Sequence, residues 1–144
     1  MKITVLGRGN AGCLTALHYG YYTRNRKDIS VELIHNPNRP PEKVGQGSLQ
    51  DLPKLLWESM SVNWYDNPID ATPKFGILYE NWGKKNHKFM HPFPLGQSAL
   101  HYTPSKLQET ILKIFGILSG SPIVMVTKLL IKKKISLIFS ITLR

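Results

Sequence analysis

The sequence is short of cysteine, of acidic residues and of long apolar runs, and each shortage excludes a class of protein. Cys13 is the single cysteine among 144 residues, so a disulfide framework is excluded. Its place inside a predicted helix indicates a small buried residue rather than a redox centre. The apolar stretch at 114–126 is followed by Lys128 and falls short of the roughly 20 residues of a membrane span. Met1 leads directly into a predicted strand, with no basic and apolar leader, which predicts a cytoplasmic protein.

Acidic residues number 9 against 19 lysines and arginines, which gives a formal net charge of +10. The basic residues form dispersed groups at 24–27, 84–88 and 132–134, with no nucleic-acid-binding motif around them. Such a charge attracts polyanions non-specifically at low salt. The composition therefore predicts no dedicated nucleic-acid partner.

Histidines raise the question of a metal site. His87, His91 and His101 lie close together in sequence, but no cysteine or carboxylate accompanies them at ligand spacing. We therefore predict no metal ion.

At 144 residues and 42% hydrophobic content, the chain has the size of one ordinary domain, without room for a dinucleotide domain and a full substrate domain together.

The strongest motif is at 2–14, KITVLGRGNAGCL. A β-branched, apolar run leads into Gly7-x-Gly9-x-x-Gly12 and then into helix-forming residues. Gly7 permits a sharp turn, Gly9 lets the backbone approach a pyrophosphate, and Gly12 lets the helix pack close to the strand. The free N–H groups and the positive dipole end of the helix favour phosphate. The pattern predicts a dinucleotide site; the alternative is an ordinary glycine-rich turn of an α/β protein.

A β-α-β unit follows from the next segments. Residues 11–22 are predicted as a helix and 30–34 as a second strand, which pairs in parallel with the first. The second strand ends at His35-Asn36, where a dinucleotide fold usually places Asp or Glu for the adenosine ribose. Without that negative charge, a ribose that carries a phosphate is less strongly repelled from the site. NADP stays open as an alternative to FAD, with Arg39 as the nearest cation.

The rest of the chain gives weaker patterns. The predicted elements are a glycine-rich turn at 44–48, a helix at 49–60 with Pro53 in its first turn, a strand at 74–80, and a helix that begins at Thr103-Pro104 and runs through Ile111. The strand prediction places Phe75, Ile77 and Tyr79 on one face. From 113 onward no acidic residue occurs and the sequence is rich in Ile, Leu and Lys. Two explanations stay open for this tail: a segment not native to the domain, or a pair of buried strands.

Five short motifs together resemble the N-terminal part of the flavin-dependent tryptophan halogenases. They are GRGNAG, LIHNPNRPPEKVGQGS, ATPKFGILYENW, FMHPFP and HYTPSKLQETIL, in the family's order and spacing. The resemblance covers 1–112 and leaves out 113–144. It implies an α/β fold with an FAD-binding, Rossmann-like β-α-β domain.

The resemblance also implies a chemistry and a set of residues. In the family, reduced FAD from a separate flavin reductase, dioxygen and halide generate hypohalous acid, and a lysine delivers electrophilic halogen to tryptophan or another aromatic small molecule. Lys74 matches that catalytic lysine. The residues that match cofactor-binding positions are Gly7, Gly9, Asn10, Ala11, Gly12, His35, Asn36, Gly45, Gln46 and Gly47. The last three match a strap along the flavin, and His91, Pro92 and Phe93 are interpreted as packing residues.

Two departures and several missing motifs qualify what the resemblance implies. His35 stands where the family has an acidic ribose residue, and Gln46 stands where the strap has glutamate. The family's W-x-W-x-I-P motif, its halide site and the glutamate partner of the lysine have no counterpart in this sequence. We therefore expect a truncated, halogenase-like chain with an incomplete FAD-binding domain. The alternatives are a non-catalytic FAD- or NADP-binding module and an inert fragment.

Overall fold

The computed structural model describes residues 1–36, 38, 40–117 and 123–126. These residues form two compact units. Unit 1 consists of residues 1–43 and the described residues from Pro104 onward, and unit 2 consists of residues 44–103. Among the described residues, no helix has the length and apolar character needed to cross a membrane.

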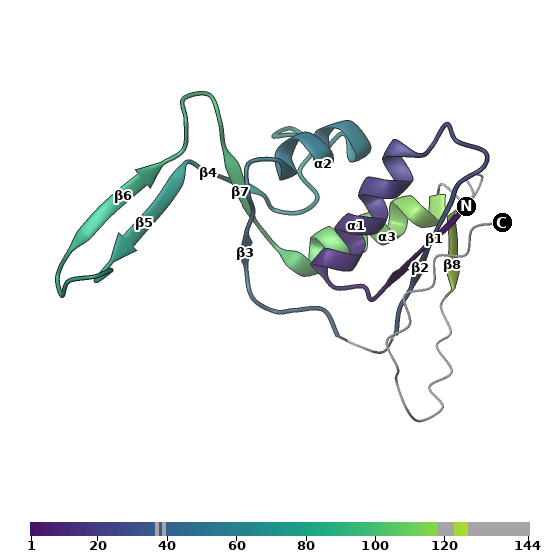
Figure 1. Cartoon of the computed structure of the whole chain (residues 1–144), viewed down its shortest axis with the longest axis horizontal. Helices are drawn as coiled ribbons and strands as arrows, with labels where there is room; N and C mark the ends of the chain where they lie inside the picture. The colour runs from purple at the N-terminus through teal and green to yellow at the C-terminus, as the bar shows by residue number, and fades with distance from the viewer. Residues whose placement is uncertain (37, 39, 118–122, 127–144) are drawn as a thin grey trace. The chain divides into compact units, whose positions relative to one another are not determined.

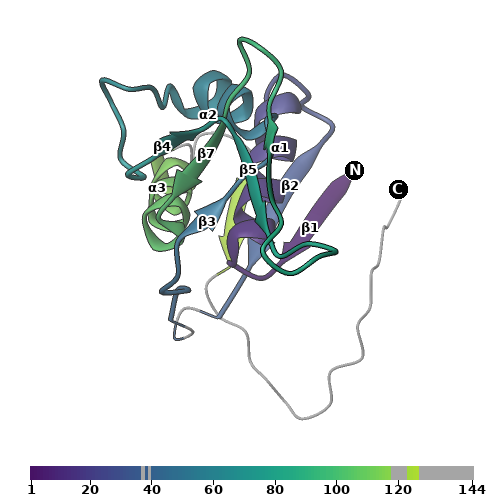
Figure 2. The same cartoon turned by 90° about the vertical axis from the view of Figure 1, so that its left-hand side faces the viewer.

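Unit 1 is built on a parallel sheet with the strand order β1-β2-β8. The strands are β1 (Lys2–Leu6), β2 (Ser30–Ile34) and β8 (Ile123–Val126). In the register, Lys2 pairs with Ser30 and Leu6 with Ile34. Helix α1 (Asn10–Tyr22) packs on β1 and β2, as Figure 2 shows. The predicted parallel β-α-β unit is therefore confirmed.

Helix α3 (Pro104–Ile117) packs against α1 and completes the core of unit 1. The helix begins at Pro104, as predicted, because proline suits the first turn of a helix, where its missing N–H costs nothing. The buried apolar side chains of unit 1 are Val5, Cys13, Ala16, Leu17, Ile29, Val31, Leu33, Leu107 and Ile111. Burial of Cys13 confirms its interpretation as a small core residue.

Unit 2 contains a small antiparallel sheet with the strand order β3-β7-β4. Its strands are β3 (Gln46–Gly47), β7 (Ala99–Tyr102) and β4 (Thr72–Lys74). Helix α2 (Leu52–Met60) packs on β7, with Pro53 in its first turn as predicted, although the helix starts later than position 49. The core holds Leu56, Val62, Ile69, Ala71, Ala99, Leu100 and Tyr102.

The strand predicted at 74–80 is confirmed for 76–80 but is wrong as a single strand. Lys74 ends β4 and pairs with Ala99 of β7, whereas β5 (Gly76–Glu80) forms a hairpin with β6 (Lys88–Pro92) (Figure 1). The change of partner occurs at Phe75, which is 63% exposed and so does not share a buried face with Ile77 and Tyr79. The alternating pattern predicts extended backbone but carries no information about which strand is the partner.

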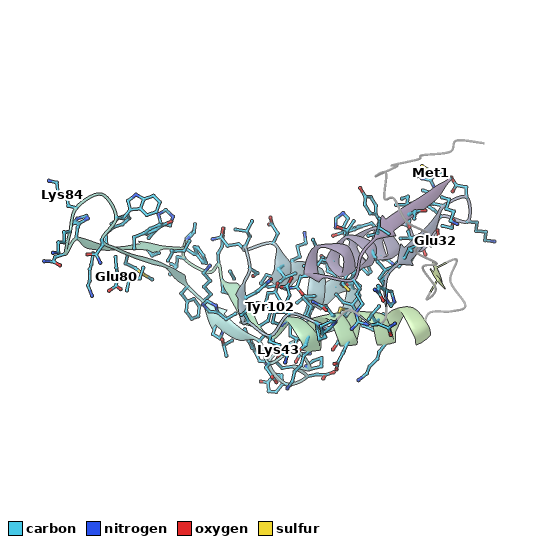
Figure 3. All side chains as sticks on the ribbon, turned by 90° about the horizontal axis from the view of Figure 1, so that it is seen from below. Met1, Glu32, Lys43, Glu80, Lys84 and Tyr102 are labelled. Atoms are coloured by element: carbon cyan, nitrogen blue, oxygen red, sulfur yellow. The ribbon has the colours of Figure 1, made fainter. Side chains whose placement is uncertain are left out.

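The hairpin presents apolar and charged side chains to solvent. Every residue of β6 is exposed, including Phe89 and Met90. His91 and Pro92 are therefore not packing residues, which corrects the interpretation from sequence. Aromatic stacking of Tyr79 on Phe89, at 4.8 Å between ring centroids, and an ion pair between Lys88 and Glu80 join the two strands. Figure 3 shows Lys84 at the closed end of the hairpin and Glu80 beside it.

The tail can be described only in part. Helix α3 runs without a break across position 113, and β8 pairs in parallel with β2. Residues 118–122 and 127–144 lie outside the described residues. The predicted boundary between 112 and 113 stays a prediction.

Candidate functional site

The glycine loop between β1 and α1 has the geometry of an anion cradle. Gly7 has φ +104°, a left-handed conformation that favours glycine. Its N–H donates to the carbonyl of Ile34 at 2.7 Å, which holds the loop against the end of β2. A Cβ at Gly12 would overlap the carbonyl group of Gly7, with the carbonyl carbon only 2.8 Å away. The loop and the helix therefore approach each other as closely as the glycine motif predicts.

The start of α1 is open to a ligand. Its N-cap is Gly9, which has no side chain to accept a hydrogen bond from the first turn. The first intrahelical bond runs from the Cys13 N–H to the Gly9 carbonyl at 2.9 Å, so the N–H groups of Ala11 and Gly12 precede the bonded ladder of the helix. A Cβ at Gly9 would meet no atom within 4 Å. This arrangement fits a pyrophosphate, which accepts hydrogen bonds from backbone N–H groups at a helix N-terminus.

Asn10 has a structural contact beside this loop. Its side chain is buried, and its Oδ1 accepts a hydrogen bond from Gln108 Nε2 at 2.8 Å. Gln108 belongs to α3 and is also buried. The amide pair ties the beginning of α1 to α3, so the side chain of Asn10 is occupied in the fold.

His35 and Arg8 lie where β2 and β1 end. The side chain of His35 is buried, and neither its Nδ1 nor Arg8 Nε has a hydrogen-bond partner among the residues that the structure describes. Burial lowers the pKa of His35, and the nearby Arg8 guanidinium lowers it further, so the imidazole is neutral at pH 7. Asn36 is exposed, and its Oδ1 accepts a hydrogen bond from the Asn38 N–H at 2.9 Å.

In unit 2 the structure brings the strap residues and Lys74 together. Gly47 on β3 pairs with His101 of β7, and Lys74 on β4 pairs with Ala99 of the same strand. A Cβ at Gly47 would lie 3.4 Å from Lys74 Nζ and 3.4 Å from the His101 ring. Gln46 accepts a hydrogen bond from Tyr102 Oη at 3.4 Å, whereas Gly45 lies just before β3.

The Lys74 ammonium has aromatic rather than acidic neighbours. Its Nζ lies 5.6 Å from the centroid of the Phe93 ring, within the range of a cation–π interaction. Among the described residues, Lys74 forms no ion pair with a carboxylate. A half-buried ammonium without a counter-ion is available to donate a hydrogen bond to a ligand.

Sequence alone assigned Arg8 no role, interpreted Phe93 as a packing residue and considered His101 only for a metal site. Arg8 can be identified in the sequence as the second residue of the glycine motif. That its Nε is buried without a hydrogen-bond partner can be seen only in the folded chain. Phe93 and His101 reach Lys74 only through strand pairing, which no local pattern specifies. Arg39, the cation favoured by the sequence, lies outside the described residues.

A separate cavity of about 320 Å³ lies in unit 2, away from Lys74. Its lining includes Leu56 and Trp57 of α2, Trp64, and Leu100 of β7. The amides at its rim, Asn63 and Asn67, are engaged in backbone hydrogen bonds of their own loop. Nowhere in the described ranges do three or more His, Cys, Asp or Glu side chains cluster as metal ligands would.

Comparison with known proteins gives consistent matches. A family model described as tryptophan halogenase matches residues 2–112. Tryptophan 6-halogenase SttH of Streptomyces toxytricini is 26% identical over 95 residues, which cover 64% of this chain and 17% of SttH. The chain therefore spans about a sixth of the length of that relative.

Solved structures show the same fold. A tryptophan halogenase from Shewanella frigidimarina superposes with a TM-score of 0.72 at 15% identity, over 93% of this chain and 38% of that chain. Xcc4156, a flavin-dependent halogenase from Xanthomonas campestris, gives a TM-score of 0.69 at 13% identity, over 87% of this chain and 34% of that chain. At these identities the likeness concerns the fold, which corresponds to about a third of each structure.

Proposed function

Because the chain belongs to the tryptophan halogenase family, we propose that it carries the FAD-binding loop and the halogen-transferring lysine of a flavin-dependent halogenase. Reduced FAD, with dioxygen and halide, supplies hypohalous acid in this family. The acceptor is tryptophan or another electron-rich aromatic small molecule, and a separate flavin reductase supplies the reduced cofactor. The observation that carries the proposal is the convergence of Gly47 and Lys74 on β7, since strap and lysine are both needed beside one flavin.

The residues of unit 1 have a binding role in this proposal. Backbone N–H groups of Asn10, Ala11 and Gly12 donate to the pyrophosphate, and Gly7 and Gly9 keep side chains out of its way. His35 and Asn36 lie at the end of β2, where the adenosine ribose of a dinucleotide is bound. None of these contacts requires a charged side chain.

The residues of unit 2 have a chemical role. The Lys74 ammonium donates a charge-assisted hydrogen bond to hypohalous acid and so makes its halogen more electrophilic. Phe93 and the His101 imidazole flank the ammonium without neutralising it. Gly45, Gln46 and Gly47 form the strap, and Gly47 lies beside Lys74 Nζ.

The first test is cofactor binding by the full chain. FAD fluorescence should be quenched saturably, and Gly9→Val should weaken binding at least about tenfold, because a branched side chain blocks the N–H groups of α1. Lys84→Ala, at the exposed hairpin end, is the matched control and should bind like the wild type. Retained affinity in a folded Gly9→Val chain would contradict the proposed loop.

The second test concerns Lys74. The chain is supplied with reduced FAD, bromide and tryptophan, and brominated product is measured by mass spectrometry. Where the wild-type chain forms product, Lys74→Met should abolish it while leaving FAD affinity unchanged, and Lys84→Met should leave both unchanged. FAD binding without any halide-dependent product from the wild type would refute the catalytic half of the proposal. That result would favour a non-catalytic FAD-binding module.

A further inference from the structure

Two buried nitrogen atoms mark a place for a ligand at the edge of the unit 1 sheet. Arg8 Nε and His35 Nδ1 have no hydrogen-bond partner among the described residues. The residues that carry them follow paired strands, because β1 and β2 pair in parallel and the Gly7 N–H donates to Ile34 O at 2.7 Å, and the Arg8 charge acts on His35. A buried polar atom without a partner costs free energy, and a ligand that completes its hydrogen bond recovers that cost.

The position of His35 relates these nitrogens to the helix. Side chains alternate along β2, so Val31, Leu33 and His35 point to one face, and the first two are buried in the core that α1 covers. His35 therefore lies beneath the N-terminal end of α1, and only 5% of it is exposed. The start of α1, the imidazole and the guanidinium therefore all lie at the end of the sheet where β1 and β2 finish.

The electrostatics at that end of the sheet favour an anion. A dinucleotide fold usually places a carboxylate at the end of its second strand, where it binds ribose hydroxyls and repels a ribose phosphate. Here a neutral imidazole occupies the position, and Arg8 forms no ion pair within the described ranges. The acidic residue of β2, Glu32, lies on the opposite face, where its carboxylate contacts Lys2 Nζ at 2.9 Å.

We propose that Arg8 and His35 bind a phosphate group on the adenosine ribose of a nucleotide. The site then prefers adenine nucleotides phosphorylated at the 2′ or 3′ position over their unphosphorylated counterparts. This inference rests on the nucleotide site of the proposed function and adds a ligand class to it. FAD carries no such phosphate, so a ribose-phosphorylated nucleotide competes with FAD for the adenosine end.

The test is calorimetric titration of the full chain with adenosine 5′-diphosphate, adenosine 2′,5′-bisphosphate and adenosine 3′,5′-bisphosphate at one ionic strength. One of the bisphosphates should bind about tenfold tighter than the 5′-diphosphate, the size expected of a charge-assisted contact. Arg8→Gln should remove the preference. Arg24→Gln removes the same charge from the exposed end of α1 and should leave the preference intact.

Two further measurements separate the possible failures. His35→Gln keeps a neutral side chain and should retain most of the preference, whereas His35→Glu should reverse it if the chain stays folded. Equal affinities for all three nucleotides, or a preference that falls equally in Arg8→Gln and Arg24→Gln, overturn the inference alone when FAD still binds. A folded chain that binds neither FAD nor these nucleotides overturns the proposed nucleotide site as well.

Discussion

The close approach of α1 to the loop before it leaves no room for a side chain at Gly12. In Gly12→Ala the new methyl group would lie 2.8 Å from the Gly7 carbonyl carbon and closer still to its oxygen. Carbon atoms in contact are normally about 3.5–4.0 Å apart, so the helix must move by about 1 Å. Both partners are backbone, so no side-chain rotation relieves the overlap. We expect a loss of about 3 kcal/mol in the free energy of unfolding.

Gly9→Ala is the matched control, because it adds the same methyl group three residues away. Gly9 has φ −64°, which any residue adopts, and its Cβ would meet nothing within 4 Å. We expect a loss of about 1 kcal/mol or less, since alanine is a poor N-cap. Urea denaturation followed by circular dichroism measures both variants. A Gly12→Ala chain within about 1 kcal/mol of the wild type would show that α1 moves freely from the loop, and would refute the argument.

Three further predictions concern buried polar and thiol groups. The pKa of His35 in the folded chain is below its ordinary value of 6.5, so the unfolded chain takes up a proton first as the pH falls. The stability that is present above pH 6.5 is therefore lost as the pH falls through the folded pKa. His35→Gln should flatten this part of the plot of urea midpoint against pH. Gln108→Ala should lower the free energy of unfolding by about 2 kcal/mol, because Asn10 loses a buried hydrogen-bond partner. A double-mutant cycle with Asn10→Ala should give a coupling energy of about 1 kcal/mol, whereas additive losses would contradict the hydrogen bond. Burial raises the pKa of Cys13 to about 11, so a thiol reagent at pH 8 should label it only in denaturant; rapid labelling of the native chain would show that the core is open.

The parts of the structure that sequence could predict are those determined by local patterns. The strand, glycine turn and helix at 2–22 are adjacent in the chain, so the apolar run and the three glycines specify them directly. Pro104 likewise predicts the start of α3, because proline is favoured only in the first turn. His35 was recognisable as a departure, since a dinucleotide fold expects an acid there.

Other features depend on partners that are distant in sequence. Lys74 meets Gly47 because both strands pair with β7, and Ser48 bonds to Leu100 across 52 residues. The sequence of β6, which includes Lys, His and Pro, does not predict a strand. The segment is extended because it pairs with β5. The missing partners of Arg8 Nε and His35 Nδ1 depend on burial in the fold, which no local pattern specifies.

The division of unit 1 into two segments has a consequence for protein synthesis. The hydrogen bond between Asn10 and Gln108 spans 98 residues, and all of unit 2 lies between them. A nascent chain therefore exposes the glycine loop long before α3 leaves the ribosome to support it. All of unit 2 has been synthesised before the second segment of unit 1. Bringing the two segments of unit 1 together closes a long loop of chain, which is slow. The contact between α1 and α3 is therefore among the last parts of unit 1 to form during synthesis.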